Sequence, residues 1–371
     1  MDKTPELKII ERPGKFNGDI VETELPIEND ILDIAPINGE SSSTWLILDA
    51  TGALHRLNCD EARCDIIGRI PIIAEPGHQP WCDHSLTNRL YVSNAGLFAA
   101  VVNDYGKQGV VVSLATSHVT MNLYGGDYHC ETVPFSFSFV EHNGRTLVLH
   151  RTDWNRLDIS DAANGDLLTE RRIAPYETGK QRPEHYLDYF HGGLFVSPDG
   201  TLTADDGWIW HPVGVPTVFS ISAWLAGSLW ESEDGSSMLS LCNRAYYWDA
   251  AMCWIDSARI AVGGLGDDEE EMVDGARIFD VEKIEESGSW RIAKEILSFR
   301  GPRGKFFSDG QKLFSVNEHG LNIWDAGDGA RVGVIPELQA THQHLGAREM
   351  VELRGKTMRR WQFGVSEVEN F

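Results

Sequence analysis

Basic residues are scarce in this chain of 371 residues. Lysine and arginine together number 32 against 56 aspartates and glutamates, which gives a formal net charge of −24 at pH 7. Proteins that bind nucleic acid neutralise phosphates with lysine and arginine, and a strongly acidic chain is repelled by anionic surfaces. We therefore expect neither nucleic acid nor a membrane surface as a partner. The charge favours a basic protein or peptide instead.

Cysteine is sparse as well. The 6 cysteines are irregularly spaced, and the closest pair, Cys59 and Cys64, has no second pair at ligand spacing. A disulfide framework or a structural zinc site needs such a pattern. The N-terminal residues also lack the apolar run of a secretory signal. The sequence thus predicts a cytoplasmic protein with free thiols, without a metal or cofactor.

The residue patterns of common catalytic sites are also missing. The chain contains no G-x-S-x-G motif, and the glycine-rich residues 263–266 (GGLG) lack the lysine and the helix of a phosphate-binding loop. Cys82 and His84 lie close in sequence, but a nucleophile and its base are normally brought together by the fold. We name no catalytic residue from the sequence.

Glycine and tryptophan, in contrast, are abundant, with 36 and 12 residues. The clearest pattern lies in residues 304–336, where the runs KFFSDG, QKLFSVNEHG, LNIWDAGDG and ARVGVIP follow one another. Apolar runs this short, each ended by a turn residue, are typical of strands. Four such strands form an antiparallel meander with two apolar faces, and stacking meanders around an axis buries both faces.

The same succession of short apolar runs, each ended by a turn residue, recurs along the chain. Further units cover residues 29–71, 80–123, 135–171, 189–221 and 253–296, and an incomplete unit covers residues 348–363. Residues 19–27 (DIVETELPI) look like an outer strand without a unit of its own. We therefore predict an all-β fold, a β-propeller of seven four-stranded blades that forms a single domain over residues 1–371. The N-terminal strand would close the ring on the last blade, and helices are expected only as insertions at 221–230 and 281–286.

Several of these segments resemble WD-repeat proteins. The resemblance is carried by residues 323–325 (IWD), 197–200 (SPDG), 307–310 (FSDG), 191–192 (HG), 278–280 (IFD), and the equivalent stretches 161–165 (DAANG) and 325–329 (DAGDG). It implies a WD40-like propeller, similar to bacterial members of unassigned function, and it implies no activity. An aspartate in such turns bonds nearby backbone amides. We expect Trp324 to be buried between blades and His191 to stabilise a turn.

The sharpest charged feature is the acidic run Asp267, Asp268, Glu269, Glu270 and Glu271. It could bind a basic partner or calcium, although calcium loops usually separate their acids with glycine or asparagine. A solvated hairpin is the alternative. We keep these five residues as a candidate partner-binding loop.

A second candidate is Asp206, Trp208 and Trp210, which would share one face of a regular strand. Such a platform could hold a sugar or a cation, whereas a core strand between blades is the structural alternative. Two histidine sets, His185-Asp188-His191 and His342-His344, are not expected to bind metal. Residues three apart on a strand point to opposite faces, and two ligands alone do not make a site.

These observations favour a protein-interaction scaffold that binds a partner through rim loops or the central channel. An enzyme with histidine and carboxylate side chains at the channel mouth is one alternative. A propeller that binds a small ligand or a carbohydrate is another.

Overall fold

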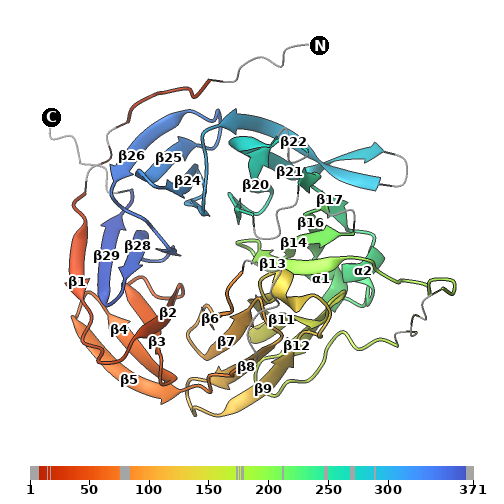
Figure 1. Ribbon diagram of the computed structural model, residues 1–371, viewed down its shortest axis with the longest axis horizontal. Helices are drawn as coiled ribbons and strands as arrows, with labels where there is room; N and C mark the ends of the chain where they lie inside the picture. The colour runs from red at the N-terminus through yellow and green to blue at the C-terminus, as the bar shows by residue number, and fades with distance from the viewer. Residues whose placement is uncertain are drawn as a thin grey trace.

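The computed structural model describes residues 8–14, 16, 18–75, 84–172, 174, 176, 179–210, 213–245, 250–267, 272–287 and 290–364. Nearly all regular structure is β, and Figure 1 shows the sheets standing side by side around a central axis. Among the described residues there are six sheets. The ten-stranded one contains two meanders, so the ring has seven blades, numbered here in chain order.

The first three blades follow the predicted meander. Blade 1 consists of β2 (Ile31–Pro36), β3 (Thr44–Asp49), β4 (Ala53–Asn58) and β5 (Arg63–Arg69). Blade 2 consists of β6 (Thr87–Val92), β7 (Phe98–Asp104), β8 (Gln108–Ser113) and β9 (Val119–Tyr124). After the short 3-10 helix η1 (Cys130–Thr132), blade 3 has β10 (Phe137–His142), β11 (Arg145–Asp153) and β12 (Arg156–Asp161). Its outer strand is reduced to a single bridge between Ser160 and Leu167.

Blades 4 and 5 share the ten-stranded sheet. Blade 4 contains β13 (Phe190–Val196), β14 (Leu202–Ile209), β15 (Val213–Gly214), β16 (Thr217–Ser220), β17 (Leu239–Ser240) and β18 (Arg244–Ala245). Blade 5 contains β19 (Met252–Trp254), β20 (Arg259–Leu265), β21 (Val273–Ser287) and β22 (Trp290–Arg300). The long arm of β21 and β22 reaches back to blade 4, where β22 pairs in parallel with β17 at Ser240 and Ile292.

The last two blades close the ring. Blade 6 has β23 (Phe306–Ser308), β24 (Lys312–Asn317), β25 (Gly320–Asp325) and β26 (Arg331–Pro336). Blade 7 has β27 (His342–His344), β28 (Glu349–Arg354) and β29 (Thr357–Gln362). Its fourth strand is β1 (Val21–Glu24), which pairs antiparallel with β29 from Val21–Arg360 to Glu24–Thr357. The prediction that residues 19–27 complete the last blade is confirmed.

The core lies between the blades. Seven clusters of buried apolar side chains each combine residues of two neighbouring blades, and the cluster of Trp45, Ile47, Val351 and Met358 joins blade 7 to blade 1. Middle strands are covered on both faces, so they are apolar at nearly every position, as in the fully buried β3 (TWLILD). The outer strand β5 (RCDIIGR) has solvent on one side and contains no fully buried residue.

The turn motifs have the predicted geometry. Asp199 accepts hydrogen bonds from Ser197 Oγ at 2.6 Å and from the Thr201 amide at 3.2 Å, and Gly200 has a φ of +73°. A positive φ is readily adopted by glycine because glycine has no Cβ. The Trp324 side chain is buried between blades 5 and 6, where its Nε1 donates to Ser315 Oγ at 2.9 Å.

The helical predictions were right at one site and wrong at the other. Residues 221–230 contain α1 (Ile221–Leu225), capped by Ser220, and α2 (Glu231–Asp234) follows directly. Residues 281–286 are part of β21 instead of a helix. They pair with β22, with Ile284 opposite Ala293, so cross-strand pairing overrides the local preference. In the described part of the chain, no helix is long and apolar enough to cross a bilayer.

Candidate functional site

The site is built at one end of blades 3 and 4. In an antiparallel meander, the crossover into a blade and the turn between its second and third strands lie at the same end. We call this end the crossover rim. The crossover from β9 to β10, the β11–β12 turn and the β14–β15 turn all belong to it.

Two glycines allow β13 and β14 to approach each other closely at this rim. A Cβ on Gly192 would lie 2.0 Å from the Asp206 carbonyl oxygen, and a Cβ on Gly207 would lie 2.2 Å from the Tyr189 ring. The strand register shifts between Phe190 and Gly193, which marks a β-bulge. The close approach places the Phe190 ring directly on the Trp208 ring.

Six aromatic side chains gather there, and we call them the aromatic patch: Tyr128, His129, Trp154, Phe190, Trp208 and Trp210. Phe190 and Trp208 are buried and stacked, with ring centroids 4.0 Å apart. Tyr128 and Trp210 stay 47% and 43% exposed. Both of these rings contact His129, at 4.6 Å and 5.3 Å between centroids. Two half-exposed aromatic rings therefore rest on a buried aromatic base.

The backbone at His129 is unusual for a residue other than glycine. His129 precedes η1 with a φ of 50°, in the left-handed region. Such conformations cost free energy and often occur at binding or catalytic sites. Its Nδ1 lies 3.3 Å from Glu131 Oε1, which orients the ring that both exposed aromatic side chains contact.

Carboxylates surround the aromatic patch. Asp127 accepts hydrogen bonds from the Lys107 ammonium and from Tyr124 Oη, and these bonds lower the pKa of its carboxyl group. Asp153 is exposed and accepts a hydrogen bond from the Trp154 amide at 2.8 Å. A Cβ on Gly126 would lie 2.5 Å from Asp153 Oδ1, so this carboxylate lies against the segment that carries Tyr128. Within the described residues Asp153 forms no salt bridge.

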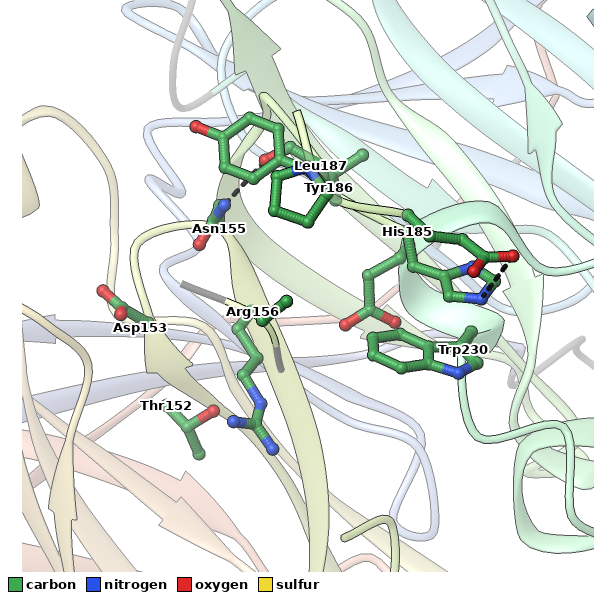
Figure 2. A pocket seen from close by; sticks show the side chains of 12 residues that line it. Thr152, Asp153, Asn155, Arg156, His185, Tyr186, Leu187 and Trp230 are labelled. Atoms are coloured by element: carbon green, nitrogen blue, oxygen red, sulfur yellow. Dashed lines mark hydrogen bonds and ion pairs between the residues drawn. The ribbon is translucent and has the colours of Figure 1, made fainter. Parts of the chain in front are cut away.

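A cavity of about 170 Å³ is lined by residues of the β11–β12 turn and of the segment 183–187 before β13. Figure 2 shows Asp153, Asn155 and Arg156 on one side of this cavity and His185 and Trp230 on the other. Its volume corresponds to about six water molecules, since each occupies about 30 Å³ in the liquid. The Asn155 amide donates to the Leu187 carbonyl oxygen at 2.6 Å, which fixes the wall of the cavity.

Three of the charged residues that line the cavity, Arg156, His185 and Glu233, already have charged partners. Arg156 Nε lies 2.8 Å from Asp158, and His185 Nδ1 lies 2.9 Å from Asp234. Beneath them, the buried Arg171 binds both Asp158 and Glu233. Burial raises the pKa of Glu233, and the Arg171 guanidinium opposes this rise. The network ties α2 to blade 3 and makes the cavity a rigid feature.

The structure separates the members of the predicted ligand platform. Asp206 is buried, binds the buried Arg244 and accepts a hydrogen bond from the Ala250 amide at 2.9 Å. Trp208 is buried, whereas Trp210 lies just beyond the end of β14 and is half-exposed. Of these three side chains, Trp210 is the one that a ligand can contact.

The acidic run joins β20 to β21. Asp267 is exposed and forms a salt bridge with Arg277 at 3.0 Å. Asp268, Glu269, Glu270 and Glu271 lie outside the described residues. Because β20 and β21 are the second and third strands of blade 5, the strand ends that flank this loop, Leu265 and Val273, lie at the crossover rim.

The predicted histidine sets are dispersed. His185 binds Asp234, Asp188 binds Arg182, and the buried His191 lies 2.5 Å from Asp205 on the neighbouring strand. The interpretation of His191 as a turn residue was therefore wrong, because its side chain contacts the Asp205 carboxylate on the adjacent strand β14. His342 and His344 bond separately, to Asp33 at 3.1 Å and to the Thr44 carbonyl oxygen at 3.1 Å. No group of three or more potential metal ligands occurs in the described ranges.

Sequence reasoning missed Tyr128, His129, Trp154 and Asp153. They lie in two turns that are distant in sequence from Trp210, and no spacing rule links them. The available signal was the concentration of aromatic residues at strand ends, in YHC at 128–130 and in DWN at 153–155.

Comparison with known proteins bears on the fold. No family model and no curated protein sequence matches the chain. Solved structures do match: the β-propeller domain of Cps50 (Swd1) from Myceliophteria thermophila has a TM-score of 0.55 and 10% identity, over 94% of this chain and 100% of that one. The RRP9 WD40 repeats give 0.54 and 10% identity, over 96% and 99%. A chain of the mitotic checkpoint complex gives 0.53 and 11% identity, over 98% and 95%. The chain therefore has a WD40-like β-propeller fold.

Proposed function

We propose that this chain is a cytoplasmic, non-enzymatic docking module, one domain over residues 1–371. It binds a basic segment of a partner protein at the crossover rim of blades 3 and 4. The observation that carries this proposal is the exposure of Tyr128 and Trp210 above the buried Phe190 and Trp208. Large aromatic side chains held in place by a packed base are the residues that dominate binding energy in protein interfaces.

The rigidity of this rim supports the proposal. Side chains that are already ordered lose little conformational freedom on binding, so more of the contact energy appears as affinity. The exposed rings are held by ring contacts from blades 3 and 4, and the wall of the adjacent cavity is fixed by Asn155. A partner segment would therefore meet a preformed surface.

The charge of the molecule supports a basic partner. The net charge of −24 attracts a cationic segment at long range, and this attraction weakens as salt shortens the screening length. Asp267, the first residue of the acidic run at 267–271, follows β20 at the same rim, and we propose that the run adds a second contact for such a segment. Asp267 already binds Arg277, so the other four carboxylates would supply that contact.

The first test is affinity capture from the native cell extract at two salt concentrations. We expect one stoichiometric protein partner that is lost at high salt, with cross-links to blades 3 and 4. Deletion of residues 267–271 should weaken capture. The matched control is Ile66→Ala, which removes an exposed apolar side chain from β5 in blade 1. Absence of a partner at either salt, or cross-links that avoid this rim, would contradict the proposal.

A further inference from the structure

We infer that the aromatic patch is the recognition site for a single cationic side chain, lysine or arginine. The cation would contact the exposed rings of Tyr128 and Trp210 and face the Asp153 carboxylate. This inference rests on the proposed function and specifies the contact that the partner makes.

The first line of support is the ring geometry. Tyr128 and Trp210 both contact His129, with interplanar angles to it of 71° and 81°, and both also contact the Phe190 ring. Both rings are about half exposed, so their outer faces are accessible, and their inner contacts fix their orientation. The face of an aromatic ring carries negative charge density and attracts ammonium and guanidinium groups, most strongly in tryptophan.

The second line of support is the balance of charge around the patch. The Lys107 ammonium is bound by Asp127, and the buried Arg151 donates to the Gly106 carbonyl oxygen at 2.8 Å. The Glu131 carboxylate lies against His129. Asp153 is exposed and forms no salt bridge in the described part of the chain, and it lies beside Trp154, whose ring contacts Tyr128 at 5.2 Å. An arriving cation therefore gains a charge partner without breaking an existing ion pair.

These features favour a cation over a sugar. A sugar also stacks on exposed tryptophan and tyrosine, and its hydroxyl groups can donate hydrogen bonds to Asp153, but as a neutral ligand it gains no charge–charge attraction from the net charge of −24 or from the carboxylate of Asp153. A lysine or arginine side chain gains from both, and its apolar stem packs on the ring faces. The contact would be sensitive to salt and would distinguish cationic from neutral side chains of the same length.

The test uses the full chain labelled with 5-fluorotryptophan and monitored by fluorine NMR. The resonance of Trp210 is assigned by its absence in Trp210→Leu. Three probes are titrated: acetyl-Gly-Lys-Gly-amide, its norleucine analogue, which has an apolar chain without the charge, and maltose. We expect saturable shifts of the Trp210 resonance with the lysine peptide and binding about tenfold weaker with the norleucine peptide.

Variants separate the parts of the contact. Tyr128→Leu keeps an apolar side chain without the ring and should weaken binding of the lysine peptide several-fold. Asp153→Asn should weaken it about threefold and reduce its salt dependence. The control is Glu282→Gln, which removes an exposed carboxylate from β21, far along the chain, and should change nothing. Unchanged thermal midpoints would show that each variant is folded.

Each outcome decides the inference. Equal binding of the lysine and norleucine peptides, shifts with maltose alone, or no shift with any probe would overturn it. A partner captured at the rim without selectivity for the cation would leave the docking function standing and reject the cation site. A selective cation site without any protein partner would support the cation site and reject the docking function.

Discussion

At the residue scale, burial decides the protonation of individual side chains. His150 in β11 is buried, with its Nε2 3.1 Å from Ser160 Oγ, and burial lowers its pKa to about 4. In the unfolded chain a histidine has a pKa of about 6.5. Between these two values the unfolded chain binds the proton and the folded chain does not. The free energy of unfolding must therefore fall as the pH drops from 6.5 to 4.

This pH dependence can be measured. The shift corresponds to about 3 kcal/mol for His150 alone across this range. In His150→Gln we expect the loss of stability between pH 6.5 and pH 4 to be smaller than in the parent by up to that amount. Urea unfolding at four pH values in both proteins measures the difference. Parallel pH profiles would show that His150 takes up its proton in the folded state as readily as in the unfolded one.

At the scale of elements, the contact between neighbouring blades is the unit of stability. Trp324 is the last residue but one of β25 and fills the layer between blades 5 and 6 together with Phe299 and Leu313. Replacing it with alanine leaves a cavity between two sheets that cannot close on it. We expect Trp324→Ala to lower the free energy of unfolding by about 3–5 kcal/mol.

The matched comparison is Trp210→Ala, which removes the same side chain from a half-exposed position. It should cost about 1 kcal/mol or less, because surface substitutions outside packed layers have small effects. Urea unfolding of both variants measures the two costs. Equal losses would mean that the layer between the blades adds nothing beyond ordinary surface contact.

At the scale of the whole molecule, ring closure depends on β1. The strand pairs with β29 through four residue pairs, and without it β29 would present an open edge. We expect deletion of residues 1–24 to lower the free energy of unfolding by more than about 4 kcal/mol, at about 1 kcal/mol per lost hydrogen bond, because residues 10–14, removed together with β1, also bond to the backbone of Arg331 and Val332. It should also cause self-association, visible by size-exclusion chromatography. Deletion of residues 1–9 keeps β1 and should leave the protein monodisperse. If both deletions self-associate to the same extent, or neither does, closure of the ring by β1 would be contradicted.

The local sequence determined the strands, the turns and the number of blades. A tight turn needs only a few neighbouring residues, so SPDG at 197–200 and IWD at 323–325 were readable without a structure. The closing strand was also readable, because residues 19–27 are an apolar-polar segment without a sheet of their own. The strand conformation of residues 281–286 could not be predicted in this way, since it depends on tertiary contacts: β21 pairs with β22, and β22 pairs with β17.

The candidate site, in contrast, was decided by tertiary structure. Trp210 was visible in the sequence as part of an aromatic strand, but His129, which contacts its ring, and the further residues Tyr128, Trp154 and Asp153 come from other segments of the chain. The ring closure and the packing of blade 3 on blade 4 bring these turns to one rim. Burial then separates Asp206 and Trp208, which serve the core, from Trp210, which reaches solvent. Sequence spacing fixes which residues share a strand, whereas only the packing of sheets fixes which strand ends meet and which of their side chains remain exposed.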